Sequence, residues 1–228
     1  MAIYFIVAGV AYLLGSIPFG YILMRVFRGE DVRAIGSGNI GATNVARKAP
    51  GLGAATLVLD AGKGFAAVIA AMEIMRRLHP PAAVLVSQEQ MEAFRQALRP
   101  GVQQFYFVAA IAAVFAILGH VFPVWLKFKG GKGVATGVGA FVALAPKAVL
   151  VVLLIFVLIV AAFRYISLGS IVATAAFPIF AWLLYRYQAS PPVFGAMVVA
   201  SALIIAKHHE NIRRLLAGTE HRFELKHR

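Results

Sequence analysis

The sequence predicts an all-α integral membrane protein with about seven transmembrane helices, its N-terminus outside and its C-terminus in the cytoplasm. Hydrophobic residues make up 61% of the 228 residues and charged residues only 14%, whereas a soluble domain carries about 25% charged residues. Several apolar runs are long enough to cross a hydrocarbon core about 30 Å thick. Most of the 22 lysines and arginines fall in alternate connections, as the positive-inside rule requires of the cytoplasmic side. Residues 1–228 are therefore expected to form one membrane domain.

The apolar runs define the expected helices in order. They cover residues 3–24, 52–75, 105–122, 134–163, 166–185 and 192–206, and residues 89–98 are expected to form a short amphipathic helix on the surface. The run 134–163 decides the number of crossings. Pro146 and Lys147 lie near its middle, where proline disfavours a helix and lysine is costly inside a bilayer. A break there makes the run a hairpin and gives seven crossings.

The composition also excludes several classes of function. The chain has no cysteine, so disulfides, thiol catalysis and cysteine metal sites are excluded. The formal net charge of +13 fits loops that lie beside anionic lipid, or an anionic substrate. Nucleic acid is not an expected partner, because the basic residues are scattered between apolar spans.

The loop after the first helix clusters short polar side chains with one arginine. It contains a G-x-G-x-x-G pattern from Gly36, but no β-strand precedes it, so it does not predict a dinucleotide site. The side chains form a small polar cup in which a guanidinium can grip phosphate. The alternative is a loop of turn and N-cap residues. The residues in question are Ser37, Asn39, Thr43, Asn44 and Arg47.

A glycine-rich loop precedes the run that starts at Val134. Glycines allow successive N–H groups to converge on an anion, a lysine adds charge, and the following helix directs its positive end to the same place. The alternative is a flexible basic turn. The residues that this reading assigns to phosphate binding are Gly130, Gly131, Lys132, Gly133 and Thr136.

Two charged residues and a histidine lie inside apolar runs. Asp60 and Lys63 are three residues apart on one helix face, where an ion pair is the natural arrangement. Lys63 is also placed to reach the face that carries the loops, so it is assigned to substrate binding and Asp60 to a structural role, although the pair can equally be purely structural. His120, near the end of its run, is expected to be structural.

The C-terminal tail carries His208, Asn211 and Glu220. If the last helix continues into the tail, His208 and Asn211 share one face, where they can handle a proton or bind an oxyanion. The alternative is a basic interfacial helix. With seven crossings the tail, the first loop and the glycine-rich loop all meet on the cytoplasmic side, and this co-location favours a functional site.

Together these segments resemble the acylphosphate:glycerol-3-phosphate acyltransferases of bacterial phospholipid synthesis. The resemblance lies in residues 37–45 with Arg47, in residues 128–136 with Gly119, His120 and Pro123 before them, and in His208, Asn211, Ile212, Arg214, Leu215, Gly218 and Glu220. It extends over nearly the whole chain, although the outer stretch 76–104 is longer than is usual in that family.

The resemblance implies a seven-helix enzyme of the bacterial inner membrane, with its active site on the cytoplasmic face. Such an enzyme transfers an acyl chain from acyl phosphate to the 1-hydroxyl of glycerol-3-phosphate, giving lysophosphatidic acid and phosphate without metal or cofactor. The enzyme that makes acyl phosphate becomes a candidate partner. The resemblance makes Ser37, Arg47, His208 and Asn211 catalytic, assigns the glycine-rich loop to glycerol-3-phosphate, and makes Glu220 structural.

The residues themselves also allow a membrane transporter for a phosphorylated solute. Basic loops, intramembrane Asp60 and Lys63 and a broken span are features of carriers. However, a carrier holds its site near the midplane of the membrane, whereas the polar segments here gather on one face.

Overall fold

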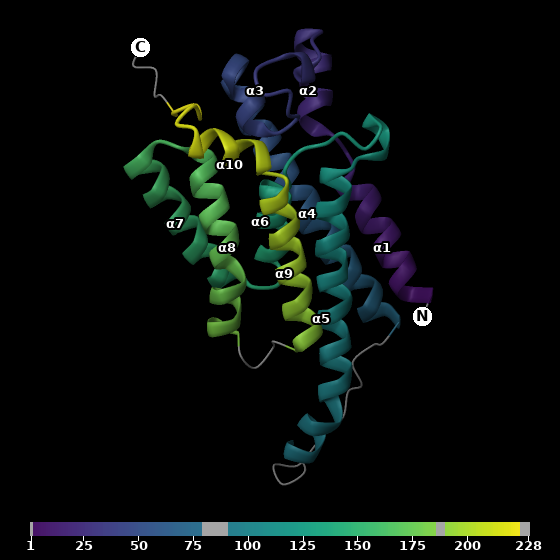
Figure 1. The fold of residues 1–228 in the computed structure, drawn as a ribbon. Helices are drawn as coiled ribbons and strands as arrows, with labels where there is room; N and C mark the ends of the chain where they lie inside the picture. Colours follow the sequence, from purple (N-terminus) through teal and green to yellow (C-terminus); the bar gives the residue numbers. More distant parts are fainter. Residues whose placement is uncertain (1, 79–90, 186–189, 224–228) are drawn as a thin grey trace.

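The computed structural model describes residues 2–78, 91–185 and 190–223, and these form a bundle of helices (Figure 1). The helices in chain order are α1 (Ala2–Gly15), α2 (Phe19–Arg28), the short η1 (Val32–Ala34), α3 (Ala42–Lys48), α4 (Pro50–Leu78), α5 (Met91–Val121), the short η2 (Val124–Leu126), α6 (Val134–Val142), α7 (Pro146–Phe163), α8 (Ile166–Leu184), α9 (Pro191–Ala206) and α10 (His209–Leu216).

The all-helical prediction is confirmed, and the number of spans is supported in part. Within the described residues, five helical segments are long and apolar enough to cross a membrane, or six if α9 and α10 count as one bent span. The remaining crossing of the expected seven would be α6, which has nine residues and is about 14 Å long. A helix of that length covers less than half of a hydrocarbon core.

Proline determines two breaks in the helices. The predicted break at Pro146 is confirmed, because α6 ends before it and α7 begins at this residue. The span expected over 3–24 is present as one candidate span, Ala2–Arg28. It is two helices and not one, because Pro18 between α1 and α2 cannot donate a helical hydrogen bond. The surface helix expected at 89–98 is also corrected, since residues 91–98 belong to the continuous helix α5, whereas 89 and 90 lie outside the described residues.

Glycines let the helices approach closely, as is common inside membranes. A Cβ on Gly15 or Gly119 would collide with the main chain of the facing helix where α1 packs on α5. Gly64 and Gly139 do the same where α4 packs on α6, against main-chain atoms of Thr136 and Ala61. Bulkier residues at these positions would separate the helix pairs.

The polar segments lie at one end of the bundle. In Figure 1, α2, α3 and α10 lie at the same end, together with the loop that leads into α6, and α1 begins towards the opposite end. Helices α7, α8, α9 and α5 pack in succession beside them. Three segments that are far apart in the sequence therefore lie at one end of the bundle.

Candidate functional site

The first loop is folded around the carboxamide of Asn44, on α3. Its Nδ2 donates hydrogen bonds to the carbonyls of Val32, Ile35 and Asn39, at 3.1, 2.9 and 2.8 Å. Its Oδ1 accepts the N–H of Ser37 at 3.0 Å. The side chain is buried, and these bonds occupy its donors, so Asn44 shapes the loop instead of facing a ligand.

The other polar residues of this loop differ in their roles. Asn39 accepts the N–H of Gly41 at 2.8 Å and closes a local turn. Ser37, Thr43 and Arg47 are exposed, so they can meet a ligand. Arg47 lies against Gly36, where an added Cβ would be 3.0 Å from a guanidinium nitrogen.

The glycine-rich loop folds back on the end of α5. The N–H of Gly130 donates to the Val121 carbonyl at 3.2 Å, and the N–H of Gly131 donates to the His120 carbonyl at 3.1 Å. The loop thereby satisfies carbonyls that a helix end leaves free. The expectation that these two N–H groups converge on an anion is wrong, because both are already bonded.

The first turn of α6 offers main-chain donors instead. Gly133 precedes it with φ +88°, in the left-handed region that favours glycine. The N–H groups that follow have no partner within the helix and carry the positive end of its dipole. Thr136, in this turn, is fully buried, and its hydroxyl has no hydrogen-bond partner among the described residues.

Lys132 stands at the start of α6 in a partly buried position. Burial lowers the pKa of its ammonium to about 8, the nearby Glu220 carboxylate acts in the opposite direction, and the positive charges of Arg214 and Arg47 lower it further. Charges of the first loop and of the tail thus both act on the ammonium of Lys132.

Asp60, Lys63 and His120 form a buried cluster. The predicted ion pair is confirmed, with Lys63 Nζ 2.7 Å from Asp60 Oδ1 and both side chains 3% exposed. Lys63 also donates to the Ile17 carbonyl at 2.7 Å, and His120 Nδ1 lies 3.6 Å from Asp60 Oδ1. Lys63 is thus enclosed by protein, and we assign it a structural role in place of the substrate contact expected from the sequence.

The tail bends at His208. The last helix does not continue, since α10 makes an angle of 56° with α9 and His208 lies just before α10. His208 is buried, and its Nδ1 lies 2.8 Å from the Ile204 carbonyl. A carbonyl only accepts, so this contact assigns the proton to Nδ1 and leaves the Nε2 lone pair to take up a proton.

Glu220 holds the tail together. Its two carboxylate oxygens accept from Asn211 Nδ2 and Arg214 Nε, each at 2.7 Å. Burial raises the pKa of Glu220, but hydrogen bonds from Asn211 and Arg214 outweigh it and hold the pKa below its usual value. The sequence alone assigned Arg214 no role. Its signal in the sequence is its position six residues before Glu220, with Gly218 between them.

The start of α6 is in contact with the end of α9, just before the tail. An added Cβ would be 3.4 Å from Ile204 at Gly133, and 3.1 Å from Ile204 at Gly137. Since His208 is bonded to the Ile204 carbonyl, His208 lies beside the start of α6, where it interacts electrostatically with Lys132. The site therefore combines exposed Ser37 and Arg47, the α6 start and the tail.

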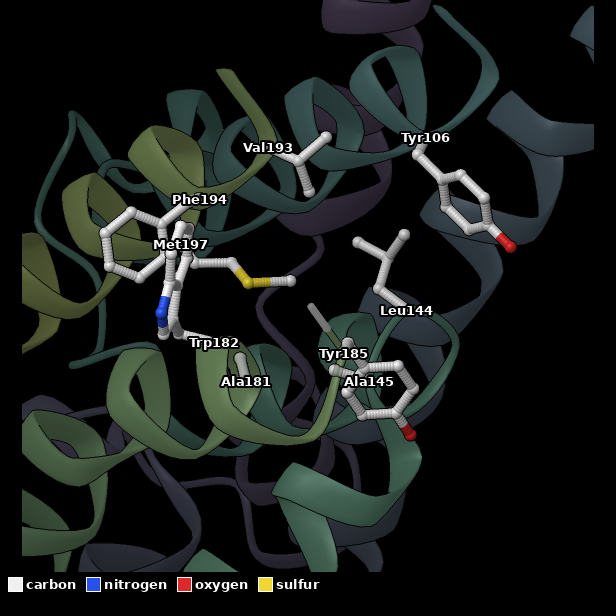
Figure 2. A pocket seen from close by; sticks show the side chains of 9 residues that line it. All are labelled: Tyr106, Leu144, Ala145, Ala181, Trp182, Tyr185, Val193, Phe194 and Met197. Carbon is white, nitrogen blue, oxygen red and sulfur yellow. The ribbon is translucent and has the colours of Figure 1, made fainter. Parts of the chain in front are cut away.

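A separate pocket lies at the far ends of α8 and α9 and has a different character. Figure 2 shows its lining, which is apolar and aromatic and includes Leu144, Trp182, Phe194 and Met197. None of its lining residues carries a charge, so it does not offer a phosphate site. In the described part of the chain, no group of three or more His, Asp or Glu side chains is placed to hold a metal ion.

Comparisons with known proteins give a consistent result. Residues 5–218 match the family model described as glycerol-3-phosphate acyltransferase. The chain is 42% identical over 225 residues to the glycerol-3-phosphate acyltransferase of Syntrophotalea carbinolica, covering 98% of this chain and 100% of that protein. It is 45% identical over 224 residues to that of Trichlorobacter lovleyi, covering 96% of this chain and 97% of the relative.

Solved structures agree with the sequence relatives. The crystal structure of PlsY, an integral membrane glycerol 3-phosphate acyltransferase, in its glycerol 3-phosphate form superposes with a TM-score of 0.77 at 35% identity, covering 97% of this chain and 96% of that one. The lysophosphatidic acid form gives a TM-score of 0.74 at 34% identity, covering 97% and 95%.

Proposed function

Because the chain belongs to the glycerol-3-phosphate acyltransferase family, we propose that it transfers an acyl chain from acyl phosphate to the 1-hydroxyl of glycerol-3-phosphate. The products are 1-acyl-glycerol-3-phosphate, which is lysophosphatidic acid, and inorganic phosphate. A PlsY relative is described in both a glycerol 3-phosphate form and a lysophosphatidic acid form, which supports this substrate and product for the present chain.

The meeting of three polar segments at one end of the bundle carries the proposal. Both substrates bear a phosphate, and the site offers two cations, Arg47 and Lys132, on different segments. The N-terminal turn of α6 adds main-chain donors. If the phosphates of both substrates bind at this end of the membrane bundle, the acyl chain of the donor can extend into the hydrocarbon core of the bilayer.

The chemistry requires alignment and a proton acceptor rather than a covalent intermediate. The 1-hydroxyl oxygen attacks the acyl carbonyl, a carbon–oxygen ester bond forms, and the bond from the acyl carbon to the phosphate oxygen breaks. Phosphate is a good leaving group, so direct transfer needs only proximity and stabilisation of the oxyanion. Ser37 and Asn211 supply hydrogen bonds in this scheme. The hydroxyl proton goes to Nε2 of His208 or to the phosphate of the donor.

The tautomer of His208 favours its candidacy as the base. The Ile204 carbonyl holds the proton on Nδ1, which is the arrangement that orients a general base. Replacing His208 with asparagine separates the two possibilities. A large loss of kcat with little change in KM would favour His208, and a retained kcat would favour the donor phosphate.

The charge distribution supports an orientation, and the bacterial relatives support a location. We propose the bacterial inner membrane, with the N-terminus outside and the site on the cytoplasmic face, where a neighbouring enzyme would supply acyl phosphate. Reporters fused after Arg228 or inserted near Lys129 should be cytoplasmic, and one near residue 90 should be outside. If the reporters after Arg228 and at Lys129 lie on opposite sides, the orientation and the shared site both fail.

Incubation of the purified protein with acyl phosphate and labelled glycerol-3-phosphate tests the reaction itself. Labelled lysophosphatidic acid and a matching release of phosphate are expected. Acyl-CoA and acyl carrier protein thioesters serve as alternative donors, and product formed only from one of them would overturn the donor assignment. Absence of product from every donor, with uptake of labelled glycerol-3-phosphate into liposomes, would replace the enzyme by a transporter.

A further inference from the structure

Gly131 has no room for a side chain, and a single neighbour occupies that space. A Cβ built on Gly131 would collide with the imidazole of His120, the three nearest atoms all belonging to that ring. The φ angle of Gly131 is outside the left-handed region, unlike that of Gly133. Glycine is therefore required at position 131 because a side chain has no room there, and not because the backbone adopts an unusual conformation. The room that a side chain would need is filled by the His120 ring.

The His120 ring faces the buried Asp60–Lys63 pair through its Nδ1. It is 3% exposed and its Nδ1 lies 3.6 Å from Asp60 Oδ1, while Asp60 is paired with Lys63 at 2.7 Å. The main chain of His120 also accepts the N–H of Gly131. The residue thus contacts the glycine-rich loop through both its carbonyl and its ring.

The same cluster reaches the segment that leads into the first loop. Lys63 donates to the Ile17 carbonyl at 2.7 Å, at the break between α1 and α2, and α2 continues towards the first loop. One buried cluster therefore connects the glycine-rich loop with the break between α1 and α2. Buried ionic groups are costly, and their partners must be kept in place.

We propose that His120 is a positioning residue for Lys132: its ring forms the wall on which Gly131 packs, and Asp60 and Lys63 hold that wall in place. Lys132 follows Gly131 directly, so a displaced loop moves the cation that binds glycerol-3-phosphate. The inference rests on the proposed function, because its kinetic test measures the KM for glycerol-3-phosphate.

The decisive experiment is rescue by complementary size. Gly131→Ala introduces the collision, and overpacking of this kind should raise the KM for glycerol-3-phosphate about tenfold or more. His120→Ala removes the ring and should raise KM a few-fold while kcat is largely retained. The double variant Gly131→Ala/His120→Ala should bind glycerol-3-phosphate better than Gly131→Ala alone, because the new methyl group occupies the space of the ring.

Gly130→Ala is the matched control. Its Cβ would meet the carbonyl oxygens of His120 and Val121 and the Pro123 ring, none of which His120→Ala removes. The Gly130→Ala defect should therefore persist in combination with His120→Ala. Rescue of both glycine variants would indicate general loosening of the loop and would overturn the proposal.

Thermal unfolding midpoints in detergent give a readout that is independent of activity. Gly131→Ala should lower the unfolding midpoint, and the double variant should recover part of that loss.

A double variant whose KM for glycerol-3-phosphate is as high as that of Gly131→Ala, or higher, would show that the substrate needs the space beside Gly131. That result would refute the role of His120. If Gly131→Ala yields no folded protein, recovery of folded protein in the double variant is the expected rescue, and an unchanged KM in His120→Ala alone would refute the proposal. Inactive wild-type protein with the expected midpoints would instead refute the proposed function and leave the packing intact.

Discussion

Raising the pH from 7 to 9 should weaken glycerol-3-phosphate binding through Lys132. Burial lowers the pKa of this ammonium to about 8, so its charge is present below that pH and lost above it. The ammonium is then about 90% protonated at pH 7, about 50% at pH 8 and about 10% at pH 9. If only the charged form binds the phosphate, the KM for glycerol-3-phosphate should rise about tenfold over this range.

The substrate does not produce this dependence by itself. The second ionisation of a phosphate monoester has a pKa of about 6, so glycerol-3-phosphate is already largely dianionic at pH 7 and changes little above it. The assay is the initial rate at saturating acyl phosphate, with glycerol-3-phosphate varied at pH 7, 8 and 9. Short reaction times limit loss of the donor by hydrolysis.

Lys132→Arg is the matched control for the charge. A guanidinium keeps its proton throughout this range, so the variant should show a flatter dependence of KM on pH, whatever its absolute KM. A wild-type KM that is constant between pH 7 and 9 would refute the assignment. An equal rise in Lys132→Arg would place the titration on another group.

Three further predictions concern the loops and the packing. Asn44→Ala removes the bonds that organise the first loop, which should cost about 1–3 kcal/mol of stability and make the loop sensitive to protease; unchanged protease resistance would contradict the role given to Asn44. Gly139→Ala should lower the unfolding midpoint because its Cβ meets the Ala61 main chain, whereas Gly62→Ala, with nothing within 4 Å, should not; equal effects would count against close packing of α4 on α6. Ser37→Ala should lose most activity, and intact-protein mass spectrometry of the wild type with donor alone should show no acyl adduct; an adduct on Ser37 that glycerol-3-phosphate discharges would overturn direct transfer.

Features that depend on local chemistry were predictable from the sequence. The break at Pro146 follows from a proline and a lysine inside an apolar run, and the structure has it. The Asp60–Lys63 pair follows from a spacing of three on a helix, and it is present at 2.7 Å. Gly218 lies two residues beyond α10 with φ +69°, the left-handed conformation in which glycine commonly ends a helix.

Features that depend on contacts between distant segments were not predictable. Asn44 was taken as a substrate contact, but its carboxamide is occupied by carbonyls up to 12 residues away, whose positions depend on how η1 and α3 pack. Gly130 and Gly131 were expected to offer N–H groups to an anion, yet the fold gives these groups to the end of α5. The sequence could not show this, because the same glycine-rich sequence is compatible with main-chain N–H groups that are free and with ones that are hydrogen-bonded to another segment.

The sequence by itself determined the membrane class, the helical elements and the identity of the polar segments. These features depend on the length of apolar runs and on the positions of charges, which are properties of consecutive residues. Only the tertiary structure decided which of those polar groups remain available to a ligand. Helix packing brings Lys132 beside His208, buries Lys63 against Asp60 and places the His120 ring on Gly131. The physical reason is that a donor or a cation already satisfied within the protein cannot also serve a substrate, and its partners are set by the fold.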